Sequence, residues 1–331
     1  MFLYKDRSGY TLSFWGGVKV NIYRSKGSAG KTVVCEHKKT KGSDSEISFK
    51  TFSSLSETIR RNCYKLPSDI DLIVGVPRSG IIPAYMLGLF LNKKVCSLDE
   101  FISGIWPWSG DRPIRSCESI KNILIVDDSV YSGSSLRKVQ ESLRKHFSKD
   151  SFNFRFLCVY ATKQSADLVD FYFEIVEQPR LFQWNYLNHS ISGQCCFDMD
   201  GVLCQDPTLE ENDDGPKYKD FIKNAKPLFI PQYEIYAIVT SRLEKYREET
   251  EEWLLKHNVK YKHLFMLNLN SAEERRKLRC HATFKAKIYC KLRKTVCFIE
   301  SDPVQAKQIS NLSGKPVICV ATDECFINQP S

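Results

Sequence analysis

Apolar runs that end in a polar turn and continue into a helical stretch recur along this chain, and this alternation constrains its fold more than any other feature. In the first half, the apolar runs Asp69–Pro77 and Asn122–Asp128 precede helical patterns over Ile81–Leu91 and Ser134–His146. A third apolar run, Phe154–Thr162, follows. Strands that alternate with helices are typical of a parallel sheet with helices on its faces. We therefore expect an α/β fold.

The same alternation restarts after a small, polar stretch at His189–Gln194. At about 150 residues per domain, a chain of 331 residues suggests two domains. We place the boundary near residue 191, which gives domains 1–190 and 191–331. Short strand-like runs and Gly- and Ser-rich turns in the first fifty residues indicate a small β region. The second alternation comprises Cys195–Leu203, Tyr233–Ser241, Lys245–Asn258, Thr295–Ser301 and Lys315–Ala321.

The composition excludes several classes of protein. Apolar residues make up 42% and charged residues 26%, which is typical of a globular chain. The longest apolar run, Ile81–Leu91, is too short to span a bilayer, and the N-terminus carries charges where a signal peptide is apolar. The thirteen cysteines lie in apolar segments without CxxC spacing, so neither a zinc site nor a disulfide framework is indicated. We expect a cytoplasmic protein with reduced thiols.

The positive charge is concentrated in the first half. Residues 1–190 contain 27 basic and 19 acidic side chains, a net charge of +8, whereas residues 191–331 contain 21 and 20, a net charge of +1. Such a basic region attracts either nucleic acid or a small polyphosphate. The basic half contains no recognition helix and no aromatic RNA-binding motif, so we expect no nucleic-acid partner.

The stretch Ile123–Leu136 joins an apolar strand, which ends in Asp127 and Asp128, to a loop of small residues and a helix. The loop, Ser129–Ser135, offers backbone N–H groups and hydroxyls to a phosphate at the helix N-terminus, where the helix dipole favours an anion. Gly133 permits a close backbone approach. The acid pair lies at the carboxyl end of the strand, a position suited to holding sugar hydroxyls. An ordinary N-capped turn is the structural alternative.

This pattern resembles the 5-phosphoribosyl-1-diphosphate (PRPP) signature of type I phosphoribosyltransferases, with Ser132 and Ser135 where threonines are common. Upstream, Gly75–Gly80 (GVPRSG) resembles the diphosphate-binding loop of that family, although a plain turn has the same composition. Phe101–Ser116 resembles the mobile loop that covers PRPP. The resemblance implies a parallel sheet with helices on both faces and a catalytic acid pair. It also implies PRPP binding by Arg78, Ser79, Gly80, Arg112, Arg115, Asp127, Asp128, Ser129, Val130, Tyr131, Ser132, Gly133, Ser134 and Ser135.

The chemistry of PRPP accounts for these parts. The ribosyl–diphosphate bond breaks through an oxocarbenium-like state, so catalysis consists of positioning and of electrostatic stabilisation of the leaving diphosphate. Mg²⁺ on the diphosphate and the ribose hydroxyls lowers the charge of the leaving group. Arg112 and Arg115 would close over the diphosphate, with solvated surface arginines as the alternative. Trp106 and Trp108 would seal the loop, contact the acceptor or simply pack.

A second motif, Cys196–Cys204, is an apolar strand that ends in Asp-x-Asp-Gly. Asp198 and Asp200, two residues apart, emerge around one strand end. Calcium loops share this acid spacing, but they lack the apolar approach, and no acidic ladder follows. The segment resembles the first motif of haloacid dehalogenase-like phosphatases. That resemblance implies that Asp198 attacks phosphorus to form an aspartyl-phosphate, and that Asp200 protonates the leaving alcohol and then activates water.

The later motifs of the same family follow in order. The resemblance implies that Thr240 binds the phosphoryl group with help from Ser241, and that Lys285, or its rival Lys287, neutralises phosphate and nucleophile. The first two motifs are close in sequence, so any cap is small and leaves the site open to a large substrate. The resemblance implies a Rossmann-like fold with a minimal cap and an Mg²⁺ site formed by Asp198, Asp200, Glu300 and Asp302, where the direct ligand of the last two stays open.

The two resemblances fit one pathway, because a phosphoribosyltransferase leaves a 5-phosphate that a phosphatase can remove. The whole chain resembles the bifunctional PRPP-dependent ribofuranosyltransferases of bacterial O-antigen or capsule synthesis. That resemblance implies PRPP as donor, a lipid-linked glycan as acceptor, peripheral membrane contact through this acceptor, and Mg²⁺ in both sites. Pro179–Asn185, which carries aromatic residues, would line the acceptor groove or belong to the core.

Two other function classes stay open. A nucleobase phosphoribosyltransferase fused to a nucleotidase would use both sites and would make a nucleoside. Alternatively, the first domain senses PRPP and regulates the phosphatase, although an intact Arg78 and acid pair argue against a dead site. The acceptor sugar, the linkage, the anomeric configuration and the oligomeric state are not set by these motifs.

Overall fold

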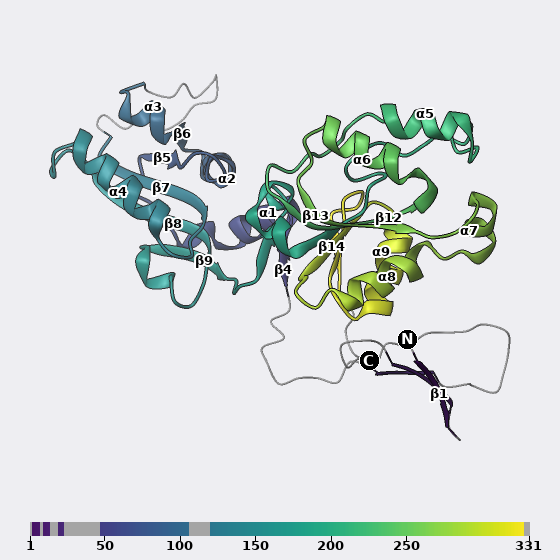
Figure 1. The fold of residues 1–331 in the computed structure, drawn as a ribbon. Helices are drawn as coiled ribbons and strands as arrows, with labels where there is room; N and C mark the ends of the chain where they lie inside the picture. The colour runs from purple at the N-terminus through teal and green to yellow at the C-terminus, as the bar shows by residue number, and fades with distance from the viewer. Residues whose placement is uncertain (1, 7–8, 14–18, 23–46, 106–119, 328–331) are drawn as a thin grey trace. The chain divides into compact units, whose positions relative to one another are not determined.

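The computed structural model describes residues 2–6, 9–13, 19–22, 47–105 and 120–327 (Figure 1). The chain forms two compact units, one within Ser45–Tyr186 and the other containing Leu187–Ser331. Near the N-terminus, a small antiparallel sheet fits the expected β region, and the strand-like run at 31–38 lies outside the described residues. Its strands are β1 (Phe2–Asp6), β2 (Gly9–Ser13) and β3 (Lys19–Ile22).

The Ser45–Tyr186 unit is built on a five-stranded parallel sheet with the strand order β6-β5-β7-β8-β9. A short parallel pair, β4 (Ser48–Lys50) with β10 (Arg180–Phe182), joins the two ends of the unit. The sheet strands are β5 (Leu72–Gly75), β6 (Lys94–Ser97), β7 (Asn122–Ser129), β8 (Asn153–Ala161) and β9 (Phe171–Ile175).

Helices cover both faces of this sheet, because successive strand residues point to opposite sides. Leu124 and Val126 of β7 pack with α1 and α2, whereas Ile123 and Ile125 pack with α3 and α4. The helix α1 begins at Thr51, whose side chain and that of Ser54 form a capping box. The helical segments are α1 (Phe52–Asn62), η1 (Cys63–Lys65), α2 (Ile81–Leu91), α3 (Leu98–Ile102), α4 (Ser134–His146) and η2 (Ala166–Leu168).

The Leu187–Ser331 unit has a six-stranded sheet with the order β13-β12-β11-β14-β15-β16. Its strands are parallel except for β16, which pairs antiparallel with β15. The sheet is therefore mixed, with one antiparallel edge strand. The strands are β11 (Cys195–Phe197), β12 (Ile235–Leu243), β13 (Tyr261–Leu267), β14 (Cys297–Glu300), β15 (Val317–Cys319) and β16 (Glu324–Phe326).

Helices also cover both faces of the second sheet; Figure 1 shows α6 on one side of β12 and β14, and α8 and α9 on the other. Ala286 and Ile309 pack against Phe298 on the side of α8 and α9, and Trp253 of α6 is fully buried. The helical segments are η3 (Tyr186–Asn188), η4 (Ser190–Gln194), α5 (Pro216–Asn224), η5 (Glu244–Tyr246), α6 (Arg247–Lys256), α7 (Ala272–Leu278), α8 (His281–Lys291) and α9 (Pro303–Ser313).

The expected α/β fold with helices on both faces is confirmed for both sheets. None of the helices in the described ranges combines the length and the apolar character that crossing a bilayer requires. No disulfide joins the described cysteines, and seven of them are buried. Cys35 and Cys117 lie outside the described residues.

Candidate active sites

In the Ser45–Tyr186 unit, the loop after β5 lies against the end of β7. The backbone N–H of Val76 donates to the carbonyl of Val126 at 2.8 Å. A Cβ on Gly80 would lie 2.6 Å from the Val126 carbonyl oxygen and 2.8 Å from the Cα of Asp127, so only glycine fits there. The carboxyl ends of two neighbouring parallel strands thus bring the Arg78–Gly80 loop and the acid pair together, with Arg78 exposed.

Asp127 and Asp128 lie in the last residues of β7 and have different surroundings. Asp128 is 4% exposed, and its Oδ2 accepts a 2.6 Å hydrogen bond from the indole Nε1 of Trp184. The Oδ1 of Asp127 accepts from the Asp128 backbone N–H at 2.9 Å. Burial, and then the adjacent Asp128 carboxylate, raise the pKa of Asp127 well above its ordinary value. A site of this kind favours a cation or hydroxyl donors beside the pair.

The turn after the acid pair leads into α4 with its small side chains exposed. Gly133 is the N-cap, with φ of +70°, and it has no side chain to cap the helix; the backbone N–H of Ser134 donates to Ser132 Oγ at 3.4 Å. Such a helix end binds anions readily. Ser129 is half-buried, and Val130 is buried among apolar side chains. The backbone of Val130 is already engaged, because its N–H donates to the Tyr160 carbonyl and its own carbonyl accepts from Ser165 Oγ and Arg180. Exposed in this turn are Tyr131, Ser132, Ser134 and Ser135.

The segment Pro179–Asn185 is mostly core. Its Arg180–Phe182 part forms β10 and is buried, and the Arg180 guanidinium donates to the carbonyls of Val130 and Val176 at 2.9 and 3.1 Å. Only Trp184, half-buried and stacked on Phe182 with ring centroids 4.9 Å apart, reaches the acid pair. The predicted loop residues Trp106, Trp108, Arg112 and Arg115 lie outside the described residues.

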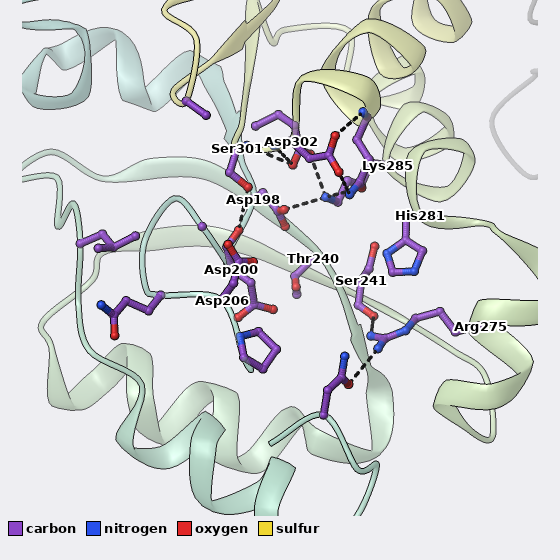
Figure 2. Close-up of a pocket in the computed structure, with 18 of the residues that line it drawn as sticks. Asp198, Asp200, Asp206, Thr240, Ser241, Arg275, His281, Lys285, Ser301 and Asp302 are labelled. Carbon is purple, nitrogen blue, oxygen red and sulfur yellow. Dashed lines mark hydrogen bonds and ion pairs between the residues drawn. The ribbon is translucent and has the colours of Figure 1, made fainter. Parts of the chain in front are cut away.

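In the Leu187–Ser331 unit, Lys285 connects the two acids that end β11 and β14. Its Nζ lies 2.6 Å from Asp198 Oδ2 and 2.7 Å from Glu300 Oε2, with Gln305 Oε1 at 3.1 Å (Figure 2). All three charged side chains are nearly inaccessible to solvent. Lys287, two residues along α8, is exposed. Lys285 is therefore the lysine that contacts the predicted nucleophile.

This ion pair governs the charge of Asp198. Burial raises the pKa of Asp198 well above its ordinary value; the Lys285 ammonium opposes that rise, and the neighbouring Glu300 adds to it. Lys285 thus favours the ionised form of Asp198, which a nucleophile needs.

Asp200 is held by a residue that the sequence motifs did not reveal. The buried guanidinium of Arg242 donates through Nη2 to Asp200 Oδ1 at 2.5 Å, and through Nε to Oδ1 and Oδ2 at 3.1 and 3.2 Å. Cys204 Sγ lies 3.4 Å from the same Oδ1. Arg242 therefore fixes the orientation of Asp200, whose carboxylate stays partly accessible to the cavity.

The carboxyl end of β12 contributes hydroxyl groups to the same cavity. Thr240 is fully buried, and its Oγ1 accepts from the backbone N–H of Arg242 at 3.1 Å. Ser241 Oγ has no hydrogen-bond partner among the described residues. Figure 2 shows Thr240 between Asp198 and Ser241. The cavity that these side chains line has a volume of about 670 Å³, which is in the range of small-molecule sites.

Oxygen atoms suited to a divalent cation lie at the acidic side of this cavity. The absence of a side chain at Gly201 leaves room for Asp206, whose Oδ2 would lie 2.8 Å from a Cβ there. Burial, and then Asp200 and Glu300, raise the pKa of Asp206, so the carboxylates crowd one another. Asp302 Oδ1 accepts from two backbone N–H groups at the start of α9.

No group of three or more metal-ligating side chains is preformed among the described residues. Mg²⁺ commonly binds through one or two carboxylates and completes its shell with substrate phosphate and water. The donors present, which are hard oxygens around a partly open cavity, fit such a cation.

Four site residues escaped the sequence analysis for different reasons. Arg242 directly follows Thr240 and Ser241 inside an apolar strand, and a charge in such a place was a usable signal. Asp206 lies two residues after the Asp-x-Asp-Gly segment Cys196–Cys204 and belongs to none of the motifs. Arg275 and His281 carried no signal, because basic residues of helical segments are usually exposed.

No family model and no curated protein matches this chain. Solved structures that match include a purine phosphoribosyltransferase from Pyrococcus horikoshii, 23% identical, over 42% of this chain and 93% of that chain, with a TM-score of 0.32. A xanthine-guanine-hypoxanthine phosphoribosyltransferase from Helicobacter pylori is 17% identical over 43% and 93% of the two chains, with a TM-score of 0.32. A hypothetical protein from Neisseria gonorrhoeae with bound ppGpp is 18% identical over 43% and 90%, also at 0.32. Likenesses at these TM-scores establish no family.

Proposed function

We propose that this chain is a two-site enzyme that transfers a phosphoribosyl group from PRPP to an acceptor and then hydrolyses the 5-phosphate of the product. The observation that carries the proposal is the buried Asp198–Lys285–Glu300 arrangement beside an open cavity. A carboxylate that is buried, ion-paired and accessible from a cavity has the properties of a nucleophile toward phosphorus.

In the hydrolytic site, a carboxylate oxygen of Asp198 attacks phosphorus, a new O–P bond forms, and the ester O–P bond breaks. The leaving alcohol oxygen takes a proton from Asp200, which is the role that the resemblance implies for this residue. In the second half, water attacks the aspartyl-phosphate, Asp200 takes the proton of this water, and inorganic phosphate leaves. Lys285 and the Thr240 hydroxyl stabilise the equatorial oxygens.

The acidic side of the cavity would hold Mg²⁺ through Asp198, the Asp200 carbonyl oxygen and one or more of the carboxylates of Asp206, Glu300 and Asp302. When bound, the cation supplies charge stabilisation at the phosphoryl group. Glu300 is engaged by Lys285, and Asp302 caps α9, so the structure offers Asp206 as a further oxygen donor beside them.

In the transferase site, the proposal is supported by the close approach of the Arg78–Gly80 loop to Asp127 and by the glycine N-cap that precedes α4. The loop would hold the diphosphate, the turn at Ser129–Ser135 the 5-phosphate, and the acid pair the ribose hydroxyls. The bond from ribose C1 to the diphosphate oxygen breaks, an acceptor oxygen or nitrogen bonds to C1, and the acceptor loses its proton. The site positions the groups and stabilises charge.

For the acceptor we propose a glycan hydroxyl. Removal of the newly installed phosphate leaves a plain ribofuranoside, which suits a polysaccharide. The resemblance of the chain to bifunctional ribofuranosyltransferases supports the same acceptor. Trp184, which is half-buried and bonded to Asp128, places an aromatic ring near the acid pair, and such a ring suits a sugar or a base. A nucleobase acceptor and a PRPP-sensing first domain are therefore the outcomes that the experiment must separate.

The test uses the full-length Asp198→Asn protein with Mg²⁺ and PRPP. It is offered lipid-linked glycans and free nucleobases, and product masses are read. We expect a glycan heavier by one phosphoribosyl unit with Asp198→Asn and by one ribosyl unit with the wild type. A mass gain on a nucleobase instead replaces the glycan reading with the nucleoside one.

The matched control is Asp127→Asn combined with Asp128→Asn. This variant is expected to stop PRPP consumption while the protein still hydrolyses p-nitrophenyl phosphate. If one variant abolishes both activities in a folded protein, two separate sites are not present. Tight PRPP binding without transfer to any acceptor favours the sensing role.

A further inference from the structure

The cavity beside Asp198 has a second wall, formed by Arg275 and His281 next to Ser241, that the proposed reaction leaves unused (Figure 2). Arg275 belongs to α7 and is only 6% exposed. Its Nη1 donates to the Ser241 carbonyl at 2.8 Å. Its Nη2 makes only a long contact, of 3.5 Å, with Asn212 Oδ1. Its Nε has no hydrogen-bond partner in the described part of the chain. The guanidinium is thus buried and incompletely satisfied.

The other two buried cations in the described part of this unit both have carboxylate partners. Arg242 forms an ion pair with Asp200, and Lys285 forms ion pairs with Asp198 and Glu300. Arg275 forms no ion pair with a carboxylate among the described residues. Burying a charge without a counter-charge costs free energy of folding. An unpaired guanidinium in a cavity wall therefore points to an anion that binds there.

Tyr218 and His281, which line the cavity together with Arg275, bring no negative charge. Burial raises the pKa of Tyr218 to about 12, so its hydroxyl stays protonated at neutral pH. Burial, together with Arg275 and Lys285, lowers the pKa of His281 to about 4, so the ring is neutral and available for hydrogen bonding. Because no described carboxylate forms an ion pair with Arg275, an anion bound in the cavity would supply its counter-charge.

The arrangement separates this wall from the reacting carboxylates. Figure 2 shows Arg275 and His281 on one side of Thr240, and Asp200 and Asp206 on the other. Ser241 Oγ, 8% exposed at the residue level and without a partner among the described residues, lies on the Arg275 side. At about 670 Å³ the cavity has room for more than one phosphoryl group.

We propose that Arg275, with Ser241 and His281, forms a second anion subsite, so that the phosphatase substrate is a phosphomonoester that carries another phosphate or carboxylate. This inference rests on the proposed phosphatase function and names its substrate class. Guanidinium groups bind phosphate and carboxylate through paired N–H donors. The chemistry shared by both sources is a planar or tetrahedral oxyanion.

The test compares matched substrates on the full-length protein. Ribose 1,5-bisphosphate is paired with ribose 5-phosphate, and 4-carboxyphenyl phosphate with phenyl phosphate; the two pairs separate a phosphate from a carboxylate source. We expect the wild type to prefer the doubly anionic member of at least one pair. Arg275→Gln should reduce that preference, measured as a ratio of kcat/KM values, at least tenfold, which corresponds to about 1.4 kcal/mol.

Two further variants keep the test sharp. Arg275→Lys, which keeps the charge, should retain most of the preference, and Arg276→Gln, a neighbouring exposed residue on the same helix, should match the wild type. If the ratio is unchanged in Arg275→Gln, or if the wild type has no preference in either pair, the subsite does not exist. If Arg275→Gln slows both members of a pair equally, Arg275 binds the transferred phosphoryl group instead.

A binding measurement separates this proposal from the phosphatase function itself. Calorimetric titration of the same sugar phosphates into Asp198→Asn reports the subsite without turnover. Wild-type protein that hydrolyses none of the esters, or hydrolysis that survives Asp198→Asn, overturns the phosphatase function. The anion subsite still stands in that case if ribose 1,5-bisphosphate binds more tightly than ribose 5-phosphate and Arg275→Gln removes the difference.

Discussion

Lys285 is the residue on which the charge balance of the proposed hydrolytic site depends, because it forms ion pairs with two buried carboxylates. Lys285→Met would leave Asp198 and Glu300 buried side by side without a counter-charge. Breaking a buried pair in this way destabilises a protein by about 3–5 kcal/mol. We expect a loss of that size in the free energy of unfolding, measured with urea, together with loss of phosphatase activity.

A second substitution distinguishes charge from packing. Glu300→Gln, added to Lys285→Met, removes one of the two uncompensated charges and should recover part of the lost stability but none of the activity. Lys287→Met, on the exposed side of α8, should change stability by less than about 0.5 kcal/mol. Equal destabilisation by Lys285→Met with and without Glu300→Gln would contradict this account.

His281 makes the stability of the folded protein depend on pH, in a direction that follows from its lowered pKa. Its pKa is lowered to about 4, first by burial and then by Arg275 and Lys285, whereas an unfolded histidine titrates near about 6.5. Its contribution to stability is therefore complete above about pH 6.5 and is lost as the pH falls toward 4. Because the ring is partly solvated, we expect a contribution of about 1–2 kcal/mol.

The measurement is urea unfolding at pH 7 and pH 4.5. Between pH 7 and pH 4.5, the free energy of unfolding of His281→Gln should fall by about 1–2 kcal/mol less than that of the wild type. The same change at the exposed His146 should leave the pH dependence as in the wild type. If the free energy of unfolding of His281→Gln falls with pH as steeply as that of the wild type, the ring is not buried in the neutral form.

At this scale, the motifs predicted side chains whose neighbours in sequence are distinctive. Asp198 and Asp200 stand at the end of an apolar run, and such a position is visible in the sequence. The choice between Lys285 and Lys287 was not visible, because it depends on which face of α8 meets Glu300. The pairing of Arg242 with Asp200 joins residues 42 positions apart, and no local pattern encodes it.

At the scale of elements, the turn from β5 into α2 sets the geometry of the proposed transferase site. A Cβ at Gly80 would lie within 2.8 Å of three backbone atoms, two of them in β7. Gly80→Ala must therefore push the Arg78–Gly80 loop away from Asp127. We expect at least a tenfold weaker Kd for PRPP, measured by calorimetry, and a destabilisation of about 1–3 kcal/mol from overpacking.

Gly88→Ala is the matched control, because its added methyl group would collide with the Val95 side chain in the same unit but away from the loop. It should destabilise the protein without weakening PRPP binding below its unfolding temperature. If both variants weaken PRPP binding equally, the effect of Gly80→Ala is general destabilisation and not displacement of the loop.

The elements that the sequence predicted are those with long apolar runs or strong periodicity, such as β7, β12 and α4. Among the strands that the sequence patterns did not reveal are β6 and β13. β6 spans only Lys94–Ser97, and β13, an edge strand, reads YKHLFML with exposed Lys262 and His263. Edge strands are buried on fewer sides, so they need no continuous apolar run, and their presence follows from pairing with β5 and β12.

For the whole molecule, each unit has its own hydrophobic core. The cluster around Leu124 and the cluster around Ile309 share no residue in the described ranges. Leu124→Ala should lower the stability of the Ser45–Tyr186 unit by about 2–5 kcal/mol, and Ile309→Ala should do the same for the other unit. Thermal inactivation of PRPP consumption and of phosphate-ester hydrolysis, measured on the same sample, reports each separately.

We expect Leu124→Ala to lower the inactivation midpoint of PRPP consumption only, and Ile309→Ala that of hydrolysis only. A parallel fall of both midpoints in either variant would mean that the units unfold as one. The predicted α/β class of both halves follows from periodicity alone. The separate cores depend on long-range packing, which the sequence indicates only through the polar stretch at His189–Gln194.

The hydrogen bond from Trp184 to Asp128 gives the molecule an optical signal of its own. An indole whose N–H points at a carboxylate changes its emission when that carboxylate gains a ligand or a proton. Occupancy of the acid pair should therefore be readable from intrinsic fluorescence, without labelling. The same spectrum would reveal in real time whether the two chemical steps overlap or follow one another.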